Sequence, residues 1–301
     1  MTFDYIIVGA GSAGCVLANR LSANPLNQVL LLEAGEKDRK FEIHVPAAYA
    51  KLHHSEVNWN FYTEPQPHLV NRRIYQPRGK ALGGSSAVNC MAYVRGNRED
   101  YNDWERLGNP GWGYDDLLPY FRKSEHNEQF RNRFHGQNGL LNVTHNRYVT
   151  PLARAFVAAC GERGIPANED FNGAEQDGAG LFQFTIKNAR RHSTAAAFLK
   201  PVLHRRNLRV MTGAHTQRVV LDGTRVTGVE IARRPGGPVE FIAAKKDVIL
   251  AAGSFQSPQL LLLSGIGPEA HLSEMGLPVR HHLPGVGENL QDHLFVNMNM
   301  L

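Results

Sequence analysis

The apolar positions at the start of the chain predict a strand, a helix and a second strand. Residues 4–8 form a short apolar run with three β-branched side chains, which is typical of a buried strand. Residues 15–22 carry apolar side chains at helical spacing, and Asn24-Pro25 would end that helix. A second apolar run follows at 29–32. The pattern therefore predicts a βαβ unit.

Further apolar runs indicate that the sheet resumes late in the chain. One run spans 208–211. The stretch 218–231 carries Asp222-Gly223 between two apolar halves, which is a hairpin signal. Another apolar strand is expected at 248–252. We therefore expect a β-meander inserted before this last strand.

The segment after that strand predicts one more helix. Ser257 can cap it, and Pro258 would stand at its first position, where proline is tolerated. The apolar residues 260–263 would form its buried side, and it would end near Gly265. Strands and helices alternate at both ends of the chain, which favours an α/β fold.

The composition is that of a globular protein. Of the 301 residues, 42% are hydrophobic and 20% are charged, which excludes collagen-like, coiled-coil and wholly disordered chains. Three cysteines, Cys15, Cys90 and Cys160, form no CxxC spacing, so neither a disulfide framework nor a zinc site is indicated. The N-terminus lacks signal-peptide features, and no apolar run reaches the ~18 residues of a membrane span. We expect a cytoplasmic protein, with peripheral contact to the inner membrane left open.

The charge pattern does not favour a nucleic-acid partner. The formal charge of +5 comes from 33 basic and 28 acidic residues that are scattered along the chain. The two tightest basic clusters, 190–192 and 204–206, lack the interleaved aromatic residues of a single-strand binding surface. We interpret both clusters as solvated surface.

The turn after the first strand has the pattern of a dinucleotide site. Residues 9–14 satisfy GxGxxG, and Glu33 ends the second strand 19 residues after Gly14. Gly9 would allow the tight turn, Gly11 the approach of a pyrophosphate, and Gly14 the close packing of helix and strand. The pyrophosphate would lie at the helix N-terminus, and Glu33 would accept hydrogen bonds from a ribose diol. An acidic residue there disfavours a 2′-phosphate, so FAD or NAD is expected rather than NADP.

A second glycine cluster bears on the choice between FAD and NAD, which share the same ADP half. Residues 78–89, RGKALGGSSAVN, bring small residues and backbone donors together. Such a loop can lie against a second part of a large cofactor. A surface Gly/Ser turn is the alternative interpretation.

Together these segments resemble the GMC (glucose–methanol–choline) oxidoreductases, a family of FAD-dependent alcohol-oxidising flavoproteins. Residues 79–102 are similar to the first family signature, with the Gly-Gly-Ser-Ser core followed by Asn89, Tyr93 and Gly96. Residues 253–267 are similar to the second signature at every constrained place.

The resemblance extends over the whole chain from Phe3 to His293. Residues 283–293 are similar to a further segment common to the family. The segments 170–183 and 191–195 bring the chain closest to bacterial alcohol and choline dehydrogenases within it.

The resemblance implies which residues bind FAD. The ADP half would lie against Gly9, Gly11, Ser12, Ala13, Gly14 and Glu33, and the isoalloxazine and ribityl side against Leu82, Gly83, Gly84, Ser85, Asn89 and Ala92. The backbone of Val219 would meet the adenine, and Gly253 would lie near the pyrophosphate end of the sheet. Some members attach FAD through a histidine of the first signature. Residues 79–96 contain no histidine, so a non-covalent FAD is expected.

The function implied by the resemblance is the oxidation of a primary alcohol, either choline or an aliphatic or aromatic alcohol. A hydride would pass from the carbinol carbon to the flavin N5 while a base removes the hydroxyl proton. The expected partners are therefore a small-molecule alcohol and an electron acceptor, for which the resemblance suggests a quinone. The choice of alcohol, and of dehydrogenase or oxidase, stays open.

The resemblance also implies a Rossmann-like FAD-binding domain that is discontinuous in sequence. We expect residues 1–150 to form its first part, 151–205 to form part of a substrate domain, and 206–301 to form the second part with the β-meander. The family's catalytic segment lies beyond the last motif found here, and the run 295–301 is predicted to be a strand that stops. We interpret the chain as a truncated N-terminal portion.

No residue is assigned as the catalytic base. His192 lies among arginines, His281 and His282 are adjacent and would alternate faces of a strand, and His293 belongs to a flavin-domain motif. A surface or structural role is favoured for each, and none has metal-ligand spacing. The lack of a GxSxG elbow disfavours a serine hydrolase. Two alternatives remain: an inactive FAD-binding fragment, and an NAD-dependent dehydrogenase, which the second glycine loop disfavours.

Overall fold

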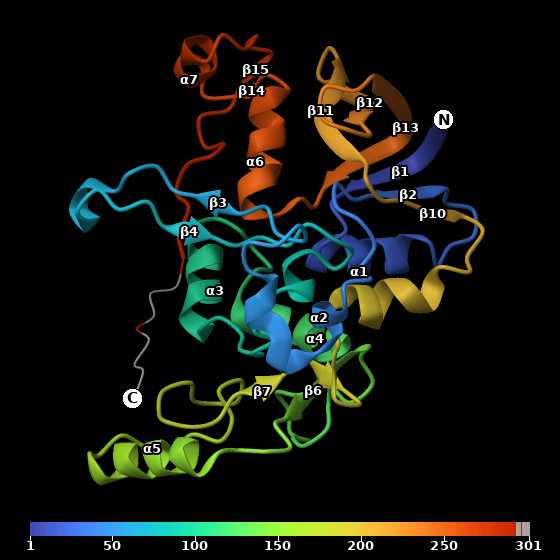
Figure 1. The fold of residues 1–301 in the computed structure, drawn as a ribbon. Coiled ribbons are helices and arrows are strands. Elements are labelled where there is room, and N and C mark those ends of the chain that lie inside the picture. The colour runs from blue at the N-terminus through green and yellow to red at the C-terminus, as the bar shows by residue number, and fades with distance from the viewer. Residues whose placement is uncertain (293–295, 297–301) are drawn as a thin grey trace. The chain divides into compact units, whose positions relative to one another are not determined.

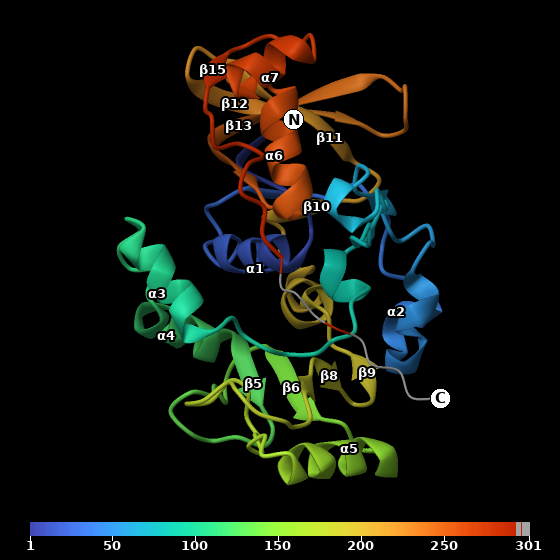
Figure 2. The same ribbon diagram turned by 90° about the vertical axis from the view of Figure 1, so that its left-hand side faces the viewer.

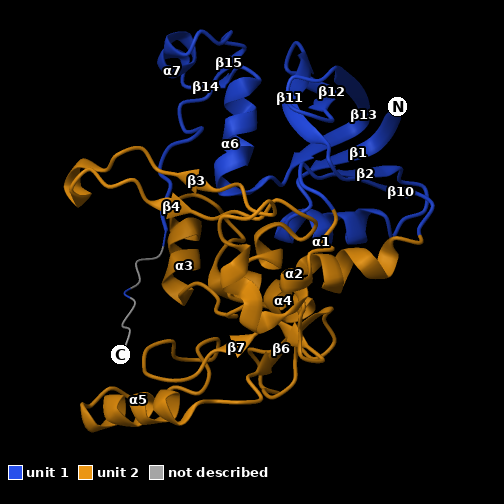
Figure 3. Cartoon of the chain, in the orientation of Figure 1, with its two compact units in different colours: residues 1–36, 205–301 blue, residues 37–204 orange. Residues whose placement is uncertain are grey.

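The fold is mixed α/β, as the alternating pattern predicts (Figure 1). The computed structural model describes residues 1–292 and 296. The chain divides into two compact units, unit 1 with residues 1–36 and 205–301 and unit 2 with residues 37–204 (Figure 3). Apart from Val296, the predicted strand at 295–301 lies outside the described residues.

Unit 1 is built on a six-stranded mixed sheet with the order β10-β2-β1-β13-β12-β11. The first four strands in this order, β10, β2, β1 and β13, are parallel to one another. β12 and β11 continue the sheet in antiparallel pairing. The elements of this unit are β1 (Thr2–Val8), α1 (Ser12–Leu21), β2 (Val29–Leu32), β10 (Leu208–Met211), β11 (His215–Asp222), β12 (Arg225–Ala232), β13 (Val239–Leu250), α6 (Gly253–Leu263), β14 (Ile266–Gly267), α7 (Glu269–Glu274) and β15 (His281–His282).

The predicted βαβ unit is confirmed as β1, α1 and β2. Ile6 of β1 lies opposite Leu30 of β2 in parallel register, and Leu208 of β10 lies opposite Val29 on the far side of β2. Ile6, Leu30 and Leu31 are fully buried, as expected for parallel strands that are covered on both faces. The helix α1 packs on β1 and β2.

The predicted hairpin is confirmed as β11 and β12, which are joined around Gly223 at φ +58°. Residues 248–250 of the strand predicted at 248–252 are the end of a longer element, β13, which stops at Leu250. Its first residues pair antiparallel with β12, and residues from Ala243 to Leu250 pair parallel with β1. One strand therefore ends the meander and also enters the parallel sheet.

The start predicted for the last long helix is wrong. The chain turns at Gly253, where φ is +88°, and α6 begins there, so that Pro258 lies inside the helix. Ser257 therefore lies inside the helix and not before it. Its Oγ still accepts a hydrogen bond from the backbone N–H of Ala252, the N-cap residue, at 3.1 Å. The predicted end is confirmed, because Ser264 is the C-cap and Gly265 follows at φ +81°.

Unit 2 consists of short strands and helices (Figure 2), and it has a second hydrophobic core. That core contains Ala81, Ala87 and Val88 of the second glycine loop. The helix α5 begins at Pro151, and the Thr150 hydroxyl caps it by accepting the N–H of Ala153 at 3.2 Å. The elements are α2 (Phe41–His44), η1 (Pro46–Leu52), β3 (Phe61–Tyr62), η2 (Pro67–Leu69), β4 (Tyr75–Gln76), η3 (Gly84–Ala87), α3 (Arg98–Arg106), α4 (Tyr114–Ser124), β5 (Glu125–Asn127), β6 (Leu141–His145), α5 (Pro151–Glu162), β7 (Gln183–Phe184), β8 (Ile186–Lys187), β9 (Arg190–Arg191), η4 (Ala195–Leu199) and η5 (Lys200–Val202).

No helix among the described residues combines the length and the apolar character that a membrane span requires.

Candidate cofactor-binding site

The turn between β1 and α1 has no room for a side chain at two of its glycines. Gly9 has φ +99°, and a Cβ atom on it would lie 2.6 Å from the carbonyl oxygen of Ala251. A Cβ atom on Gly14 would overlap the carbonyl oxygen of Gly9. The first turn of α1 therefore lies directly against the end of β1, which is the packing that a dinucleotide motif requires.

The helix α1 begins without a capping side chain. Its N-cap is Gly11, and its first turn contains no acidic residue. Ser12, Ala13 and Gly14 form that first turn, where backbone N–H groups have no acceptor within the helix. These donors and the positive end of the helix dipole favour a bound phosphate group. The residues of this turn fit the pyrophosphate of a dinucleotide.

Glu33 fastens the same turn to the end of β2. Its carboxylate accepts the backbone N–H of Ala10 at 2.9 Å and that of Gly35 at 2.8 Å, and the residue is 5% exposed. Glu33 thus has a structural role that its sequence position does not reveal, and its assignment to the ribose stays a prediction.

Val219 of β11 is connected to the C-terminal end of α6. The Val219 backbone N–H donates to the Ser264 hydroxyl at 2.9 Å, and both residues are buried. Because this N–H is engaged, an adenine contact at Val219 would use its carbonyl oxygen. Gly253, at the other end of α6, is exposed.

In unit 2, residues 79–92 fold into a tight loop around η3. A Cβ atom on Gly79 would overlap the backbone of Gly84, and Gly83 turns the chain at φ +95°. The loop is anchored rather than being a simple surface turn, because Leu82, Gly83 and Gly84 are buried while Ser85 and Asn89 are exposed. Ala92, at its end, forms a β-bridge with Phe184.

The prediction that residues 190–192 are solvated surface is wrong for two of the three. Arg191 is 3% exposed and His192 is half-buried, whereas Arg190 is exposed. The Arg191 guanidinium donates to the Ser86 carbonyl at 3.2 Å and to Asn89 Oδ1 at 2.9 Å. The reason is the long-range packing of β9 against the second glycine loop, which no local pattern of charge reveals.

Sequence reasoning also missed a buried ionic cluster in unit 2, which joins Arg95, Glu125, His135 and Asp170. Arg95 pairs with Glu125 at 2.8 Å, and the two ring nitrogens of His135 lie 2.9 Å from Glu125 and from Asp170. Burial alone would lower the pKa of His135, but hydrogen bonds to Asp170 and Glu125 outweigh it and raise the pKa to about 9. The imidazole is therefore a charged bridge between two carboxylates at neutral pH.

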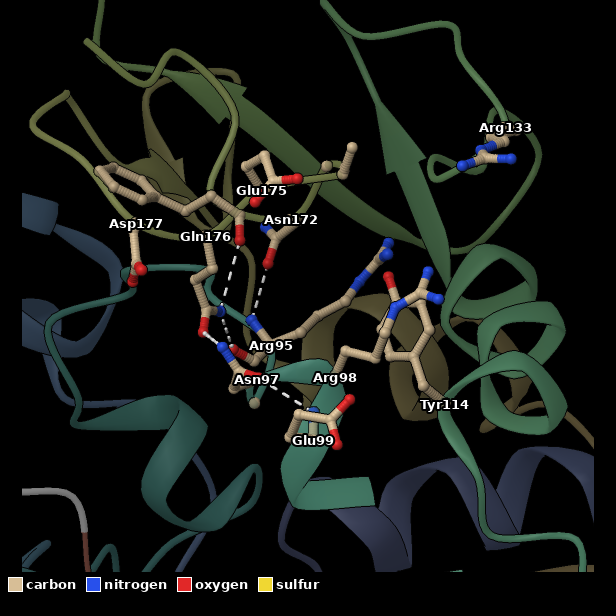
Figure 4. Close-up of a pocket in the computed structure, with 14 residues that line it drawn as sticks. Arg95, Asn97, Arg98, Glu99, Tyr114, Arg133, Asn172, Glu175, Gln176 and Asp177 are labelled. Atoms are coloured by element: carbon tan, nitrogen blue, oxygen red, sulfur yellow. Dashed lines mark hydrogen bonds between the residues drawn. The ribbon is translucent and has the colours of Figure 1, made fainter. Parts of the chain in front are cut away.

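Beside this cluster lies a polar pocket of about 470 Å³ (Figure 4). The backbone N–H of Arg95 donates to Asn172 Oδ1 at 2.7 Å, and Gln176 donates to the Arg95 carbonyl at 3.0 Å. Asn97 caps α3 by accepting the N–H of Glu99 at 2.9 Å. Asn97 also donates to Gln176 Oε1 at 3.2 Å, so these hydrogen bonds tie the loop 172–177 to the start of α3.

The histidines considered as bases are occupied or exposed. His192 Nδ1 accepts the backbone N–H of Asn142 at 3.1 Å, and burial lowers the pKa of His192 to about 4. His282 Nδ1 accepts the N–H of Glu269 at 3.1 Å, while His281 is exposed. His293 lies outside the described residues. Within the described part of the chain, no three His, Cys, Asp or Glu side chains are grouped as a metal ion would require.

Comparison with known proteins gives consistent matches over nearly the whole chain. Residues 3–295 match the GMC oxidoreductase family. The oxygen-dependent choline dehydrogenase of Rhizobium etli is 48% identical over 98% of this chain and 53% of that protein. An alcohol dehydrogenase (acceptor) of Pseudomonas putida is 46% identical over 98% of this chain and 54% of that protein. The crystal structure of pyridoxine 4-oxidase from Mesorbium loti superposes with a TM-score of 0.91 at 38% identity, over 97% of this chain and 57% of that one. The chain thus spans about half the length of the curated relatives it matches.

Proposed function

The chain belongs to the GMC oxidoreductase family, and we propose that it is the FAD-binding portion of a flavoenzyme that oxidises a small-molecule alcohol. The family and the structural neighbours of the chain are FAD-binding flavoproteins. The observation that carries the proposal is the turn at residues 9–14, where an uncapped helix N-terminus and two glycines without room for a Cβ atom fit a pyrophosphate.

The ADP half of FAD is assigned to unit 1. Gly9, Gly11 and Gly14 add no side chain to the turn, and the first-turn amides of Ser12 and Ala13 would donate to the pyrophosphate. The assignment of Glu33 to the ribose rests on its buried carboxylate at the end of β2. The carbonyl of Val219 is proposed for the adenine amino group, and Gly253 for the pyrophosphate end of the sheet.

The flavin side of the cofactor is assigned to the loop 79–92 of unit 2, on the strength of the family resemblance. The proposed residues are Leu82, Gly83, Gly84, Ser85, Asn89 and Ala92. When bound, FAD supplies the acceptor for the hydride of the alcohol. Because residues 79–96 contain no histidine, we propose that the cofactor is held non-covalently.

The assignment of sequence ranges to FAD binding and to substrate binding is a proposal, and its boundaries differ from those of the two compact units. We assign residues 1–150 and 206–301 to FAD binding and residues 151–205 to a substrate domain. The substrate is proposed to be choline or another primary alcohol, because relatives at 46–48% identity are named for choline and for alcohols. A quinone as the electron acceptor, a cytoplasmic location and peripheral contact with a membrane are proposed from the resemblance alone.

A direct test of the activity fuses this chain to the C-terminal portion of the Rhizobium etli choline dehydrogenase. The purified fusion, loaded with FAD, is assayed for dye-linked oxidation of choline and of benzyl alcohol. Oxidation that requires the fusion partner and FAD would support the proposal. FAD binding without any alcohol oxidation would favour the alternative, an inactive FAD-binding fragment.

The mode of attachment is tested separately. Acid precipitation of the FAD-loaded protein should release all of the flavin into the supernatant. Flavin that stays with the precipitate would contradict non-covalent binding.

A further inference from the structure

Arg191 is a buried cation with no carboxylate partner among the described residues. The residue is 3% exposed, and its Nε donates to the carbonyl of Ile43 at 2.8 Å. Its Nη1 donates to the carbonyl of Ser86 and to Asn89 Oδ1, so all three acceptors are neutral oxygens. Arg95, which is also buried, is paired with Glu125 at 2.8 Å. Burying a charge without a counter-ion is costly, so the position of Arg191 calls for a reason other than packing.

One donor of Arg191 is unused. Its Nη2 is buried and has no hydrogen-bond partner in the structure. Buried donors are nearly always paired, and the Nε of Arg95 is the other buried guanidinium nitrogen without a partner among the described residues. Lysine would not reproduce this arrangement, because only the planar guanidinium reaches several acceptors in fixed directions.

The loop that Arg191 contacts turns at two glycines and contains one strained residue, Met91. Gly83 has φ +95° and Gly84 has φ +51°. Met91 is not a glycine, yet it has φ +67° and is 4% exposed. Such a backbone persists only where its surroundings fix it. Asn89 Oδ1 fixes the backbone at Met91 by accepting its N–H at 3.1 Å. The Arg191 guanidinium donates a hydrogen bond to the same oxygen.

A second link fastens the loop to the segment that follows Arg191. The Ser86 hydroxyl accepts the backbone N–H of Thr194 at 3.0 Å and lies 2.9 Å from the Thr194 hydroxyl. A Cβ atom on Gly83 would come within 3.4 Å of the Cβ atoms of Ser193 and Ala195. Residues 191–195 thus pack against residues 83–91 and hold them by hydrogen bonds. The two segments are about a hundred positions apart in sequence.

We propose that Arg191 is the positioning residue of the flavin-side loop. It holds Asn89 and Ser86 so that residues 83–92 keep the conformation in which the exposed Ser85 and Asn89 meet the cofactor. Arg191 acts through Asn89 and touches no reacting atom. This inference rests on the proposed function, because it takes FAD as the ligand of the loop.

The test compares wild-type protein with Arg191→Met, Arg191→Lys and Asn89→Ala. The matched control is Arg190→Met, which removes the same charge from the exposed neighbouring residue. Backbone hydrogen exchange over residues 83–92 is measured in the ligand-free protein, and FAD dissociation constants are measured by equilibrium dialysis. Arg191→Met should raise exchange in the loop and weaken FAD binding at least about tenfold, because FAD binding must then supply the loop ordering that a hydrogen bond to a charged group supplied. Arg191→Lys should fall between wild type and Arg191→Met, and the control should match wild type.

A double variant tests whether Arg191 acts through Asn89. If it does, Asn89→Ala should weaken FAD binding much less in the Arg191→Met background than in wild type. Fully additive effects would overturn the inference, as would wild-type exchange and FAD affinity in Arg191→Met. If Arg191→Met does not fold, the test rests on Asn89→Ala, which should fold because the Asn89 side chain is exposed. Unchanged hydrogen exchange at the Met91 amide in Asn89→Ala would overturn the inference. Failure of the wild type to bind FAD would instead overturn the proposed function, and the exchange data would still decide whether Arg191 holds the loop.

Discussion

The carboxylate of Glu33 accepts the backbone N–H of Ala10 at 2.9 Å, across 23 positions of sequence. The second carboxylate oxygen accepts the N–H of Gly35 at 2.8 Å, so one buried side chain fixes both the glycine turn and the end of β2. The residue proposed for the ribose is therefore also part of the framework that shapes the glycine turn.

Replacing Glu33 by glutamine should destabilise the chain. The side-chain NH₂ group would face one of the two backbone N–H donors, and a buried donor without an acceptor costs about 1–3 kcal/mol. Urea unfolding at pH 7 should show a loss of that size. The control is Glu36→Gln at an exposed position three residues on, which should leave stability unchanged. Equal stability of the two variants would contradict the structural role of Glu33.

A methyl group at Gly14 should lower the stability of the fold far more than one at Gly161. A Cβ atom on Gly14 would overlap the Gly9 carbonyl oxygen, whereas one on Gly161 in α5 would meet no atom within 4 Å. Gly14→Ala should therefore lower the free energy of unfolding by about 3 kcal/mol or more and abolish FAD retention. Gly161→Ala should raise stability by up to about 1 kcal/mol, because alanine favours a helix. Similar unfolding curves for both variants would show that the turn is not close-packed.

Removing the Ser264 hydroxyl should test the link between α6 and β11. Ser264→Ala would leave the buried N–H of Val219 without its acceptor, at a cost of about 1–3 kcal/mol. Affinity for FAD should also fall if the carbonyl of Val219 meets the adenine, and affinity for FMN, which lacks adenine, should not change. Ser254→Ala, at an exposed position of the same helix, is the control. A variant that loses stability yet keeps full FAD affinity would argue against the adenine contact.

The ionic cluster of unit 2 should make stability depend on pH above neutrality. The pKa of His135 is raised from 6.5 to about 9 in the folded chain, so between these values the folded chain keeps a proton that the unfolded chain loses. The free energy of unfolding should be highest below pH 6.5 and fall by about 3 kcal/mol as the pH rises through 9. On the acid side, burial would raise the pKa values of Glu125 and Asp170, but their hydrogen bonds with His135 outweigh it and lower both. Their contribution is lost as these carboxylates become protonated in acid.

Chemical unfolding measured between pH 5.5 and 9.5 tests this prediction. Asp170→Asn should shrink the loss of stability and move it to lower pH, because one of the two carboxylates that hold the His135 proton is removed. His271→Gln, which changes an exposed histidine of α7, should leave the pH dependence as in wild type. A flat profile for the wild type would show that His135 is not charged in the folded chain.

The parts of the fold that could be predicted from sequence are those that local patterns determine. The β1–α1–β2 unit follows from apolar runs separated by glycines, and the β11–β12 hairpin follows from Asp222-Gly223 between two such runs. The start of α6 was misplaced because Gly253 can turn the chain directly into the helix, which puts Ser257 inside it.

The features that could not be predicted depend on contacts between distant segments. Arg191 has the sequence surroundings of a surface residue, and its burial results from acceptors at Ile43, Ser86 and Asn89, which are 102–148 positions away. The cluster around His135 likewise combines groups from four separate segments. No periodicity or short motif marks such residues in advance.

The central claim is that the turn at residues 9–14 belongs to an FAD site. The measurement that tests it most directly is the visible absorption spectrum of the purified protein after incubation with FAD and removal of the excess by gel filtration. The account predicts a flavin band that stays with the wild-type protein and is lost in Gly14→Ala. A folded wild-type protein that retains no flavin, or that binds NADH in its place, would contradict it.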